Sequence, residues 1–237
     1  MILSELTNLE IIGSSSVEIK GLSEDSRKIK SGFLFIATPG TAQDGRKYIK
    51  NAIENGAAAV LVSEDTDDSY LNLIKDKNIA LIKTKDIRTE TYKLAAAFYP
   101  KQPDTIVAIT GTSGKTSTVQ FVRELNSLLG YKSASIGTIG VVYDDFAEYG
   151  SLTSPDAITL HKTLNDVANK GITHVAFEAS SHGIELKRVE AVKIKAGAFT
   201  NLSRDHLDYH KTMEEYFKAK LGLFERLIPP GGHAVLN

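Results

Sequence analysis

An apolar run that leads directly into a glycine-rich turn and then a helix restricts the architecture of the second half of this chain. The run is Thr105-Ile-Val-Ala-Ile109, the turn lies within Thr110–Ser117, and a helical pattern continues from about Lys115 to Leu129. A short strand that is apolar throughout is typical of a parallel sheet, in which both faces are buried. We therefore predict a strand–turn–helix unit with the turn at the carboxyl end of the strand.

Other strands and helices alternate along the same half of the chain. The predicted strands cover residues 133–136, 173–177 and 196–200, and the predicted helices cover residues 154–169 and 212–227. Ser154 would cap the first of these helices, and Pro155 would occupy its first position. This alternation predicts an α/β fold with a mainly parallel sheet that helices cover on both faces.

The first hundred residues have a similar but smaller pattern. The predicted strands cover residues 33–37, 58–62 and 79–82, and the predicted helices cover residues 48–55 and 90–98. Pro100 and Pro103 interrupt helix formation, so residues 99–104 are predicted to be a linker. We predict a small N-terminal α/β domain over residues 1–101 and a central domain resembling a P-loop ATPase over residues 102–237. Residues 232–237 look like the beginning of a strand, so we expect a truncated central domain; a natural edge strand is the alternative.

Composition argues against several classes of function. The formal net charge is −1 with both signs mixed along the chain, so nucleic-acid binding is not expected and any anion site must be local. The absence of cysteine excludes disulfides, zinc-thiolate sites and thiol chemistry. No apolar run is long enough to cross a membrane, and the segment Met1–Thr7 lacks the basic region of a signal peptide. We expect a cytoplasmic protein.

The glycine-rich turn has the composition of a phosphate-binding loop. Backbone N–H groups at such a turn, together with a helix N-terminus, form an anion cradle. Lys115 would reach the β- and γ-phosphates, and the hydroxyl of Thr116 would join the shell of Mg²⁺. The strict P-loop pattern needs a glycine where this chain has Ile109, so the loop is a shorter variant; an ordinary strand-to-helix turn is the alternative. The predicted nucleotide-binding residues are Gly111, Thr112, Ser113, Gly114, Lys115, Thr116 and Ser117.

Several segments give the chain a resemblance to a known family, the Mur ligases. Thr110–Ser117 resembles the ATP loop of these enzymes. Two further segments resemble the MurE branch, which adds the third residue of the peptidoglycan stem peptide: Glu178-Ala-Ser-Ser-His-Gly183 with Arg188, and Phe199-Thr-Asn-Leu-Ser-Arg-Asp-His-Leu-Asp-Tyr-His210. Two segments near the N-terminus resemble the UDP-binding region of the MurE and MurF branches: Asp25-Ser-Arg27 and Asp44-Gly-Arg46.

The resemblance implies a function for the whole family member. It implies ATP-dependent addition of diaminopimelate or lysine to UDP-N-acetylmuramoyl-L-alanyl-D-glutamate, through an acyl phosphate, in the synthesis of peptidoglycan precursors. ATP, Mg²⁺ and the UDP-N-acetylmuramoyl dipeptide would be the ligands, and we expect a monomer without membrane insertion. The family has three domains, and this chain would lack the third, the amino-acid-binding domain. The chain alone is therefore expected to be inactive.

The resemblance also implies roles for individual residues. The uridine diphosphate end would contact Ser26, Thr41, Ala42 and Gln43. The sugar and peptide would contact Thr153, Ser154, Ser180 and Arg188. The metal ligands would be Thr116, Glu178, His206 and Lys220, with Lys220 carbamylated, and the catalytic residues would be Lys115, Lys220 and His206.

Some of these roles have independent support from the residues themselves. Glu178 follows the predicted strand 173–177 at its carboxyl end, where open α/β sheets bind ligands, and a carboxylate suits hard Mg²⁺ better than His206 does. Lys220 falls within an apolar stripe of the predicted helix 212–227, formed by Met213, Phe217, Phe224 and Leu227. A lysine in that place either extends its stem to water or has a sheltered amine of lowered pKa.

Two other classes of function fit part of the pattern. A P-loop kinase or NTPase would explain Thr110–Ser117 but not the first domain or the segment Phe199–His210. A non-catalytic module that binds ATP and a UDP-muramoyl peptide would fit every motif. Folate-adding ligases share the ATP loop, but the segment Asp25–Arg27 argues against them.

Overall fold

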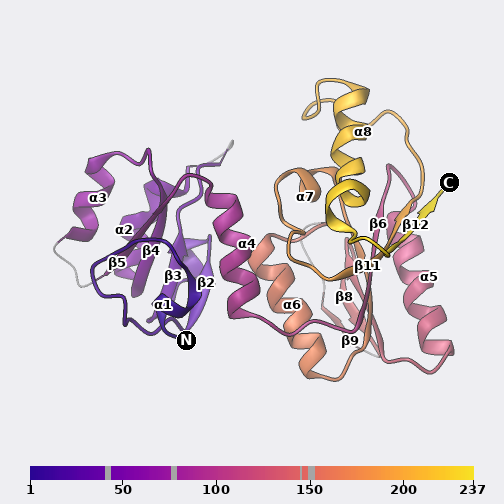
Figure 1. Ribbon diagram of the computed structural model, residues 1–237, viewed down its shortest axis with the longest axis horizontal. Coiled ribbons are helices and arrows are strands. Elements are labelled where there is room, and N and C mark those ends of the chain that lie inside the picture. The colour runs from indigo at the N-terminus through magenta and orange to yellow at the C-terminus, as the bar shows by residue number, and fades with distance from the viewer. Residues whose placement is uncertain (41–43, 76–78, 145, 149–152) are drawn as a thin grey trace. The chain divides into compact units, whose positions relative to one another are not determined.

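The chain forms two compact units, Met1–Phe98 and Tyr99–Asn237. The computed structural model describes residues 1–40, 44–75, 79–144, 146–148 and 153–237. Each unit has a β-sheet with helices packed on it, which confirms the predicted α/β class (Figure 1).

The first unit has a five-stranded sheet in the order β1-β5-β4-β3-β2. Its strands are β1 (Ile11–Ile12), β2 (Gly21–Ser23), β3 (Phe33–Ile36), β4 (Ala57–Ser63) and β5 (Ala80–Thr84). Its helices are α1 (Leu3–Leu6), η1 (Ser26–Lys28), η2 (Gly45–Tyr48), α2 (Ile49–Glu54), α3 (Asp68–Lys75) and α4 (Ile87–Phe98). Strands β2 to β5 are parallel, and β1 is antiparallel to β5. The three predicted strands correspond to β3, β4 and β5, whereas β1 and β2 are too short to produce a periodic signal.

The second unit has a seven-stranded sheet in the order β12-β11-β6-β10-β7-β8-β9. Its strands are β6 (Thr105–Thr110), β7 (Ser133–Gly137), β8 (Gly140–Tyr143), β9 (Phe146–Glu148), β10 (His174–Glu178), β11 (Ile194–Phe199) and β12 (His233–Leu236). Its helices are α5 (Lys115–Leu128), α6 (Ala157–Asn169), α7 (Ser181–Glu185), α8 (Met213–Gly222) and the π-helical turn η3 (Leu223–Leu227). All strands from β12 to β7 are parallel, and β8 and β9 extend the sheet as an antiparallel hairpin.

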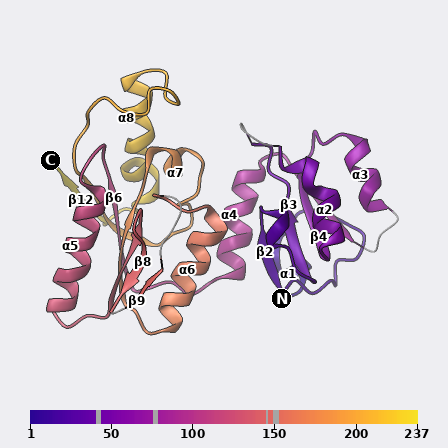
Figure 2. The same cartoon turned by 180° about the vertical axis from the view of Figure 1, so that it is seen from behind.

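Alternate residues of the central strands face opposite layers of helices. Ile106 and Ala108 of β6 belong to a core with α6 and η3, whereas Ile109 belongs to a smaller core with Val119 of α5. This alternation follows from the two-residue period of a strand. The views from both sides show α5 on one side of the sheet and α6 on the other (Figures 1 and 2).

The start of α6 differs from the prediction. Asp156, and not Ser154, is the N-cap, because its carboxylate accepts a hydrogen bond from the backbone N–H of Thr159 at 2.9 Å. The hydroxyl of Ser154 instead donates to the backbone carbonyl of Glu178 at 2.8 Å. A carboxylate that accepts an N–H bond at the helix N-terminus is also favoured by the helix dipole.

The buried face of α8 also differs from the predicted stripe. Tyr216, Lys220, Leu223 and Leu227 are buried, whereas Phe217 is 39% exposed. The buried residues follow one another at spacings of four, three and four, the period of an α-helix, so the inner stripe begins at Tyr216 and not at the neighbouring Phe217. The π-helical turn, shown by the bond from the N–H of Ile228 to the carbonyl of Leu223, comes only after these turns.

Candidate functional site

The predicted phosphate loop lies at the carboxyl end of β6. Glycine is required at each of its two glycine positions for a different reason. Gly111 has φ +138°, and a Cβ there would lie 1.9 Å from Oγ1 of Thr200. Gly114 has φ +83° and is the N-cap of α5. The first-turn N–H groups of α5 have no acceptor within the helix, because every α-helix leaves these donors unpaired. Such an N-terminus favours an anion, and a phosphate is the ligand that the loop predicts.

Two amides of the loop are not directed at this anion site. The N–H of Thr112 donates to the backbone carbonyl of Asn201 at 2.9 Å, and the N–H of Ser113 donates to Oδ1 of Asn201 at 3.0 Å. A cradle of successive loop amides was expected. In the structure these two amides are bonded to Asn201, and the first-turn N–H groups of α5 have no acceptor within the helix.

Two lysine side chains converge on one carbonyl of the loop. Nζ of Lys115 donates to the carbonyls of Gly111 at 3.0 Å and Thr112 at 2.8 Å, and Nζ of Lys220 donates to the carbonyl of Gly111 at 2.8 Å. Burial lowers the pKa of Lys220 to about 7, with repulsion from Lys115 adding to the effect and Asp205 opposing it. Burial also lowers the pKa of Lys115, although Glu178 and Asp205 oppose it. A bound anion would relieve the repulsion between the two cations.

Glu178, at the end of β10, is a buried carboxylate. Its Oε1 accepts hydrogen bonds from the hydroxyl of Thr116 at 2.9 Å and from the N–H of Thr138 at 2.7 Å. A Cβ on Gly137 would lie 2.2 Å from the same oxygen, so only glycine leaves room for the carboxylate. Because β6 and β10 are parallel neighbours, Thr116 and Glu178 meet at the edge where such sheets bind ligands.

The residues predicted to hold the sugar and peptide lie together, beside Glu178. This Ser154 group consists of Thr153, Ser154, Ser180 and Arg188. The hydroxyl of Ser154 accepts a bond from the N–H of Ser180 at 2.9 Å, and Nη1 of Arg188 donates to the carbonyl of Ser154 at 3.3 Å. The hydroxyls of Thr138 and Thr153 are 3.1 Å apart. The bond from Ser154 to the carbonyl of Glu178 joins this group to the end of β10.

His206 lies in a cluster of aromatic rings. It has φ +52°, its ring centroid is 5.3 Å from that of His182 and 6.0 Å from that of Tyr216, and Nζ of Lys220 lies 4.2 Å from the centroid of Tyr216. Among the described residues, no group of three or more His, Asp or Glu side chains is spaced to hold a metal. Thr116 and Glu178 are oxygen donors that suit Mg²⁺. An ammonium on Lys220, which donates to Gly111, does not.

The predicted UDP segment belongs to the first unit. Ser26 is buried in η1, and its carbonyl accepts a bond from the side chain of Asn55 at 2.9 Å. Asp25 caps η1 and pairs with Arg27 at 2.8 Å, and Asp44 caps η2 and pairs with Arg46 at 2.8 Å. The other three residues predicted to contact uridine diphosphate lie outside the described residues: Thr41, Ala42 and Gln43.

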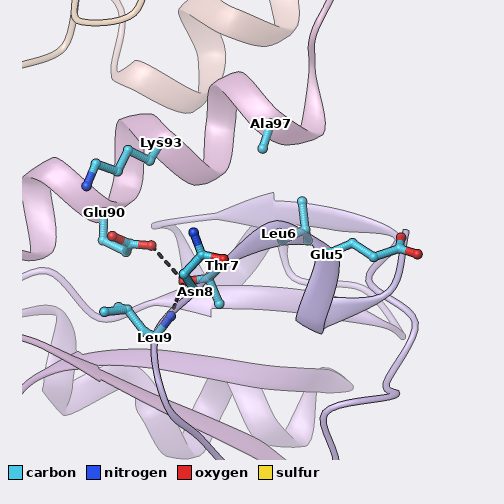
Figure 3. Close-up of a pocket in the computed structure, with 8 residues that line it drawn as sticks. All are labelled: Glu5, Leu6, Thr7, Asn8, Leu9, Glu90, Lys93 and Ala97. Atoms are coloured by element: carbon cyan, nitrogen blue, oxygen red, sulfur yellow. Dashed lines mark hydrogen bonds between the residues drawn. The ribbon is translucent and has the colours of Figure 1, made fainter.

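A pocket in the first unit involves none of the predicted residues. It has a volume of about 330 Å³ and lies between the segment Glu5–Leu9 and helix α4 (Figure 3). In its wall the hydroxyl of Thr7 donates to Oε1 of the buried Glu90 at 2.8 Å. This contact anchors α4 to the N-terminal segment.

Comparison with known proteins gives the family. A model of the Mur ligase middle domain matches residues 109–237, and a model of the Mur ligase family catalytic domain matches residues 18–99. The chain belongs to the Mur ligase family. In this Mur ligase chain, the loop, Glu178 and the Ser154 group all fall within the part that matches the middle domain. Across the described residues, no helix has the length and apolar character needed to cross a lipid bilayer.

Two of the named relatives of this Mur ligase chain are ligases of Bradyrhizobium diazoefficiens and Mesorhizobium japonicum. The chain is 45% identical to the UDP-N-acetylmuramoyl-L-alanyl-D-glutamate–2,6-diaminopimelate ligase of Bradyrhizobium diazoefficiens, over 94% of this chain and 44% of that protein. It is 44% identical to the ligase of the same name from Mesorhizobium japonicum, over 96% of this chain and 46% of that protein. The chain thus spans about half the length of the curated relatives that it matches.

A solved structure has the same fold. It is that of a UDP-N-acetylmuramoyl-L-alanyl-D-glutamate–2,6-diaminopimelate ligase, with a TM-score of 0.81 and 28% sequence identity. The match covers 100% of this chain and 52% of that one.

Proposed function

We propose that this chain is the nucleotide- and UDP-substrate-binding part of a ligase. The ligase uses ATP to join diaminopimelate to UDP-N-acetylmuramoyl-L-alanyl-D-glutamate in peptidoglycan precursor synthesis. The observation that supports this most is the meeting of Thr116, Glu178 and the Ser154 group beside the phosphate loop. The names of the relatives favour diaminopimelate over lysine as the added residue. The proposed site of action is the cytoplasm, and the proposed state is a monomer.

The proposed domain roles follow the predicted boundaries. Residues 1–101 would bind the uridine diphosphate end through Ser26 and the segment 41–43, and residues 102–237 would bind ATP. Arg188, whose guanidinium is a planar donor group, would pair with an anionic part of the muramoyl peptide.

The proposed reaction has two steps. An oxygen of the substrate carboxylate forms a bond to the γ-phosphorus of ATP while the bond to ADP breaks, which yields an acyl phosphate. The amine nitrogen then attacks the acyl carbon, loses a proton and displaces inorganic phosphate. Lys115 would leave its loop carbonyls to balance the charge on the β- and γ-phosphates, and the α5 amides would orient them.

Mur ligases in general use Mg²⁺ with ATP. In this chain Thr116 and Glu178 would hold the ion, since their oxygens are 2.9 Å apart and both belong to the hard donors that Mg²⁺ prefers. A bound Mg²⁺ would neutralise charge on the phosphates during transfer. His206 remains a proposed ligand on the strength of the resemblance.

Lys220 is proposed to be carbamylated. Its amine is buried and its pKa is lowered to about 7, so a large share of it is the neutral nucleophile near neutral pH. The amine nitrogen would attack the carbon of CO₂ and lose a proton, which turns a cation into a carboxylate-like oxygen donor. With ¹³C-bicarbonate we expect one carbamate carbon signal in the parent chain and none in Lys220→Ala; a parent without the signal contradicts the modification.

Binding of ATP tests the proposed function. We expect MgATP to bind the 237-residue chain and Lys115→Ala to weaken this binding by at least about tenfold, because a charge-assisted contact to phosphate is lost. Lys218→Ala, which removes an exposed lysine of α8, should bind like the parent. Calorimetry that gives equal affinity for parent and Lys115→Ala would refute the assignment. Binding of ATP and UDP-muramoyl dipeptide without ADP formation in a full-length relative of this chain would favour the non-catalytic module.

A further inference from the structure

The side chain of Asn201, two residues beyond the end of β11, bonds both backbone polar groups of one phosphate-loop residue, Ser113. Its Oδ1 accepts a bond from the N–H of Ser113 at 3.0 Å, and its Nδ2 donates to the carbonyl of Ser113 at 3.1 Å. Its own backbone carbonyl accepts a bond from the N–H of Thr112 at 2.9 Å. One asparagine therefore fixes two consecutive amides of the loop.

The register of the sheet brings Asn201 to this place. Phe199 is paired with Thr110 in the parallel ladder between β11 and β6, so the residues after β11 run beside the loop after β6. The hydroxyl of Thr200 donates to the carbonyl of Ser113 at 2.7 Å. The N–H of Ser203 donates to the hydroxyl of Thr112 at 3.0 Å. The segment Thr200–Ser203 thus runs along one side of the phosphate loop and is hydrogen-bonded to it.

The chemistry of the side chain suits this task. A carboxamide offers an acceptor and a donor from one planar group, which matches the backbone N–H and C=O of a single residue. Aspartate is similar in shape but offers no donor when ionised, and its charge would oppose a nearby phosphate. Alanine would leave the backbone N–H and C=O of Ser113 without this partner.

We propose that Asn201 is a positioning residue for the nucleotide. By holding the backbone N–H and C=O of Ser113, it turns that N–H away from the phosphate site and fixes the loop so that the first-turn amides of α5 and Lys115 meet the phosphates. Asn201 itself touches no phosphate. This inference rests on the proposed binding of ATP at the loop.

Two substitutions and a matched control test it in the 237-residue chain. Asn201→Ala removes both side-chain bonds, and Asn201→Asp keeps an acceptor for the N–H of Ser113. Asn165→Ala is the control, because Oδ1 of Asn165 also accepts a backbone N–H, that of Lys101 in the linker, at 3.2 Å. MgATP affinity, amide hydrogen exchange at Ser113 and the unfolding midpoint are measured for each.

We expect Asn201→Ala to speed exchange at Ser113 and to weaken MgATP binding, each by about tenfold, the effect of losing one or two hydrogen bonds. Its unfolding midpoint should equal that of Asn165→Ala. In Asn201→Asp, exchange at Ser113 should stay slower than in Asn201→Ala, while ATP binding is at least as weak.

Three results would count against the inference. Unchanged ATP affinity in Asn201→Ala would overturn the positioning role. Unchanged amide exchange at Ser113 would show that the hydrogen bonds of Asn201 do not hold this residue. A loss of affinity matched by a fall in unfolding midpoint would show a merely structural role. If the parent does not bind MgATP, both the proposed function and this inference are wrong. If the parent binds MgATP and Asn201→Ala binds it equally well, only this inference is wrong.

Discussion

His161 on α6 is a fully buried histidine with one unpaired ring nitrogen. Nε2 lies 2.9 Å from the carbonyl of Glu190, and Nδ1 has no hydrogen-bond partner within the described parts of the chain. A neutral ring that carries its proton on Nε2 satisfies the carbonyl. Burial lowers the pKa of His161 below its usual 6.5, with the bond to Glu190 opposing, so the folded state resists protonation.

This residue predicts a loss of stability in acid. Below pH 6.5 the unfolded chain takes up a proton that the folded chain refuses, so the free energy of unfolding falls as the pH drops from 6.5 to the lowered pKa. His161→Gln keeps a donor for Glu190 and does not titrate, so it should reduce this fall. Urea unfolding at about pH 7 and about pH 5 measures the difference. His233→Gln, at an exposed histidine of β12, should leave the parent's pH dependence unchanged; equal slopes for all three chains would contradict the prediction.

At the scale of elements, α8 and η3 form one continuous helical segment whose inner face carries Tyr216, Lys220, Leu223 and Leu227. Leu223 is fully buried in the core beneath β6 and β10. Phe217 was predicted to lie on the inner face but is 39% exposed, with its ring 6.0 Å from that of Phe199. The two residues are therefore expected to contribute unequally to stability.

Truncation of each side chain distinguishes the observed face from the predicted stripe. Leu223→Ala should lower the free energy of unfolding by about 2–5 kcal/mol, since it removes a buried side chain and leaves a cavity. Phe217→Ala should lower it by only about 1 kcal/mol, because a large part of the ring already contacts water. Both values come from urea unfolding. A larger decrease in the free energy of unfolding for Phe217→Ala than for Leu223→Ala would show that Phe217 lies on the inner face, as the sequence predicts.

At the scale of the whole molecule, the two faces of the second sheet are covered unequally. The face opposite α6 is packed against α5, which buries Val119 and leaves an apolar stripe on its outer side. Phe121 is 62% exposed, Leu125 is 59% exposed and Leu128 is 84% exposed. These residues are spaced by four and three positions, so they share one side of the helix. A patch of this kind favours association.

Charged substitutions on this stripe should therefore change association and not stability. We expect Leu125→Glu with Leu128→Glu to reduce weak association of the otherwise monomeric chain at high protein concentration in light scattering, with an unfolding midpoint close to the parent's. Val119→Glu on the inner side of α5 should instead destabilise the chain strongly, because it buries a charge. A large fall in midpoint for the double variant would mean that the stripe is packed.

Local chemistry in the sequence already determined the α/β class, most central strands, the glycine-rich loop and the residues that resemble a Mur ligase. Strand and helix periods, the glycine-rich turn and the Lys115-Thr116 pair are properties of neighbouring residues. Glu178 could also be placed, because the carboxyl end of a parallel strand is a known position for ligands.

Only the tertiary structure decided which distant side chains meet. Asn201 and Ser113 are separated by 88 positions and are joined by the register of β11 on β6. The convergence of Lys220 on Gly111 likewise depends on how α8 and η3 turn toward the sheet. Periodicity is a local property, whereas strand order, register and the rotation of a helix follow from packing of the whole core, so the sequence pattern alone carries no signal for these contacts.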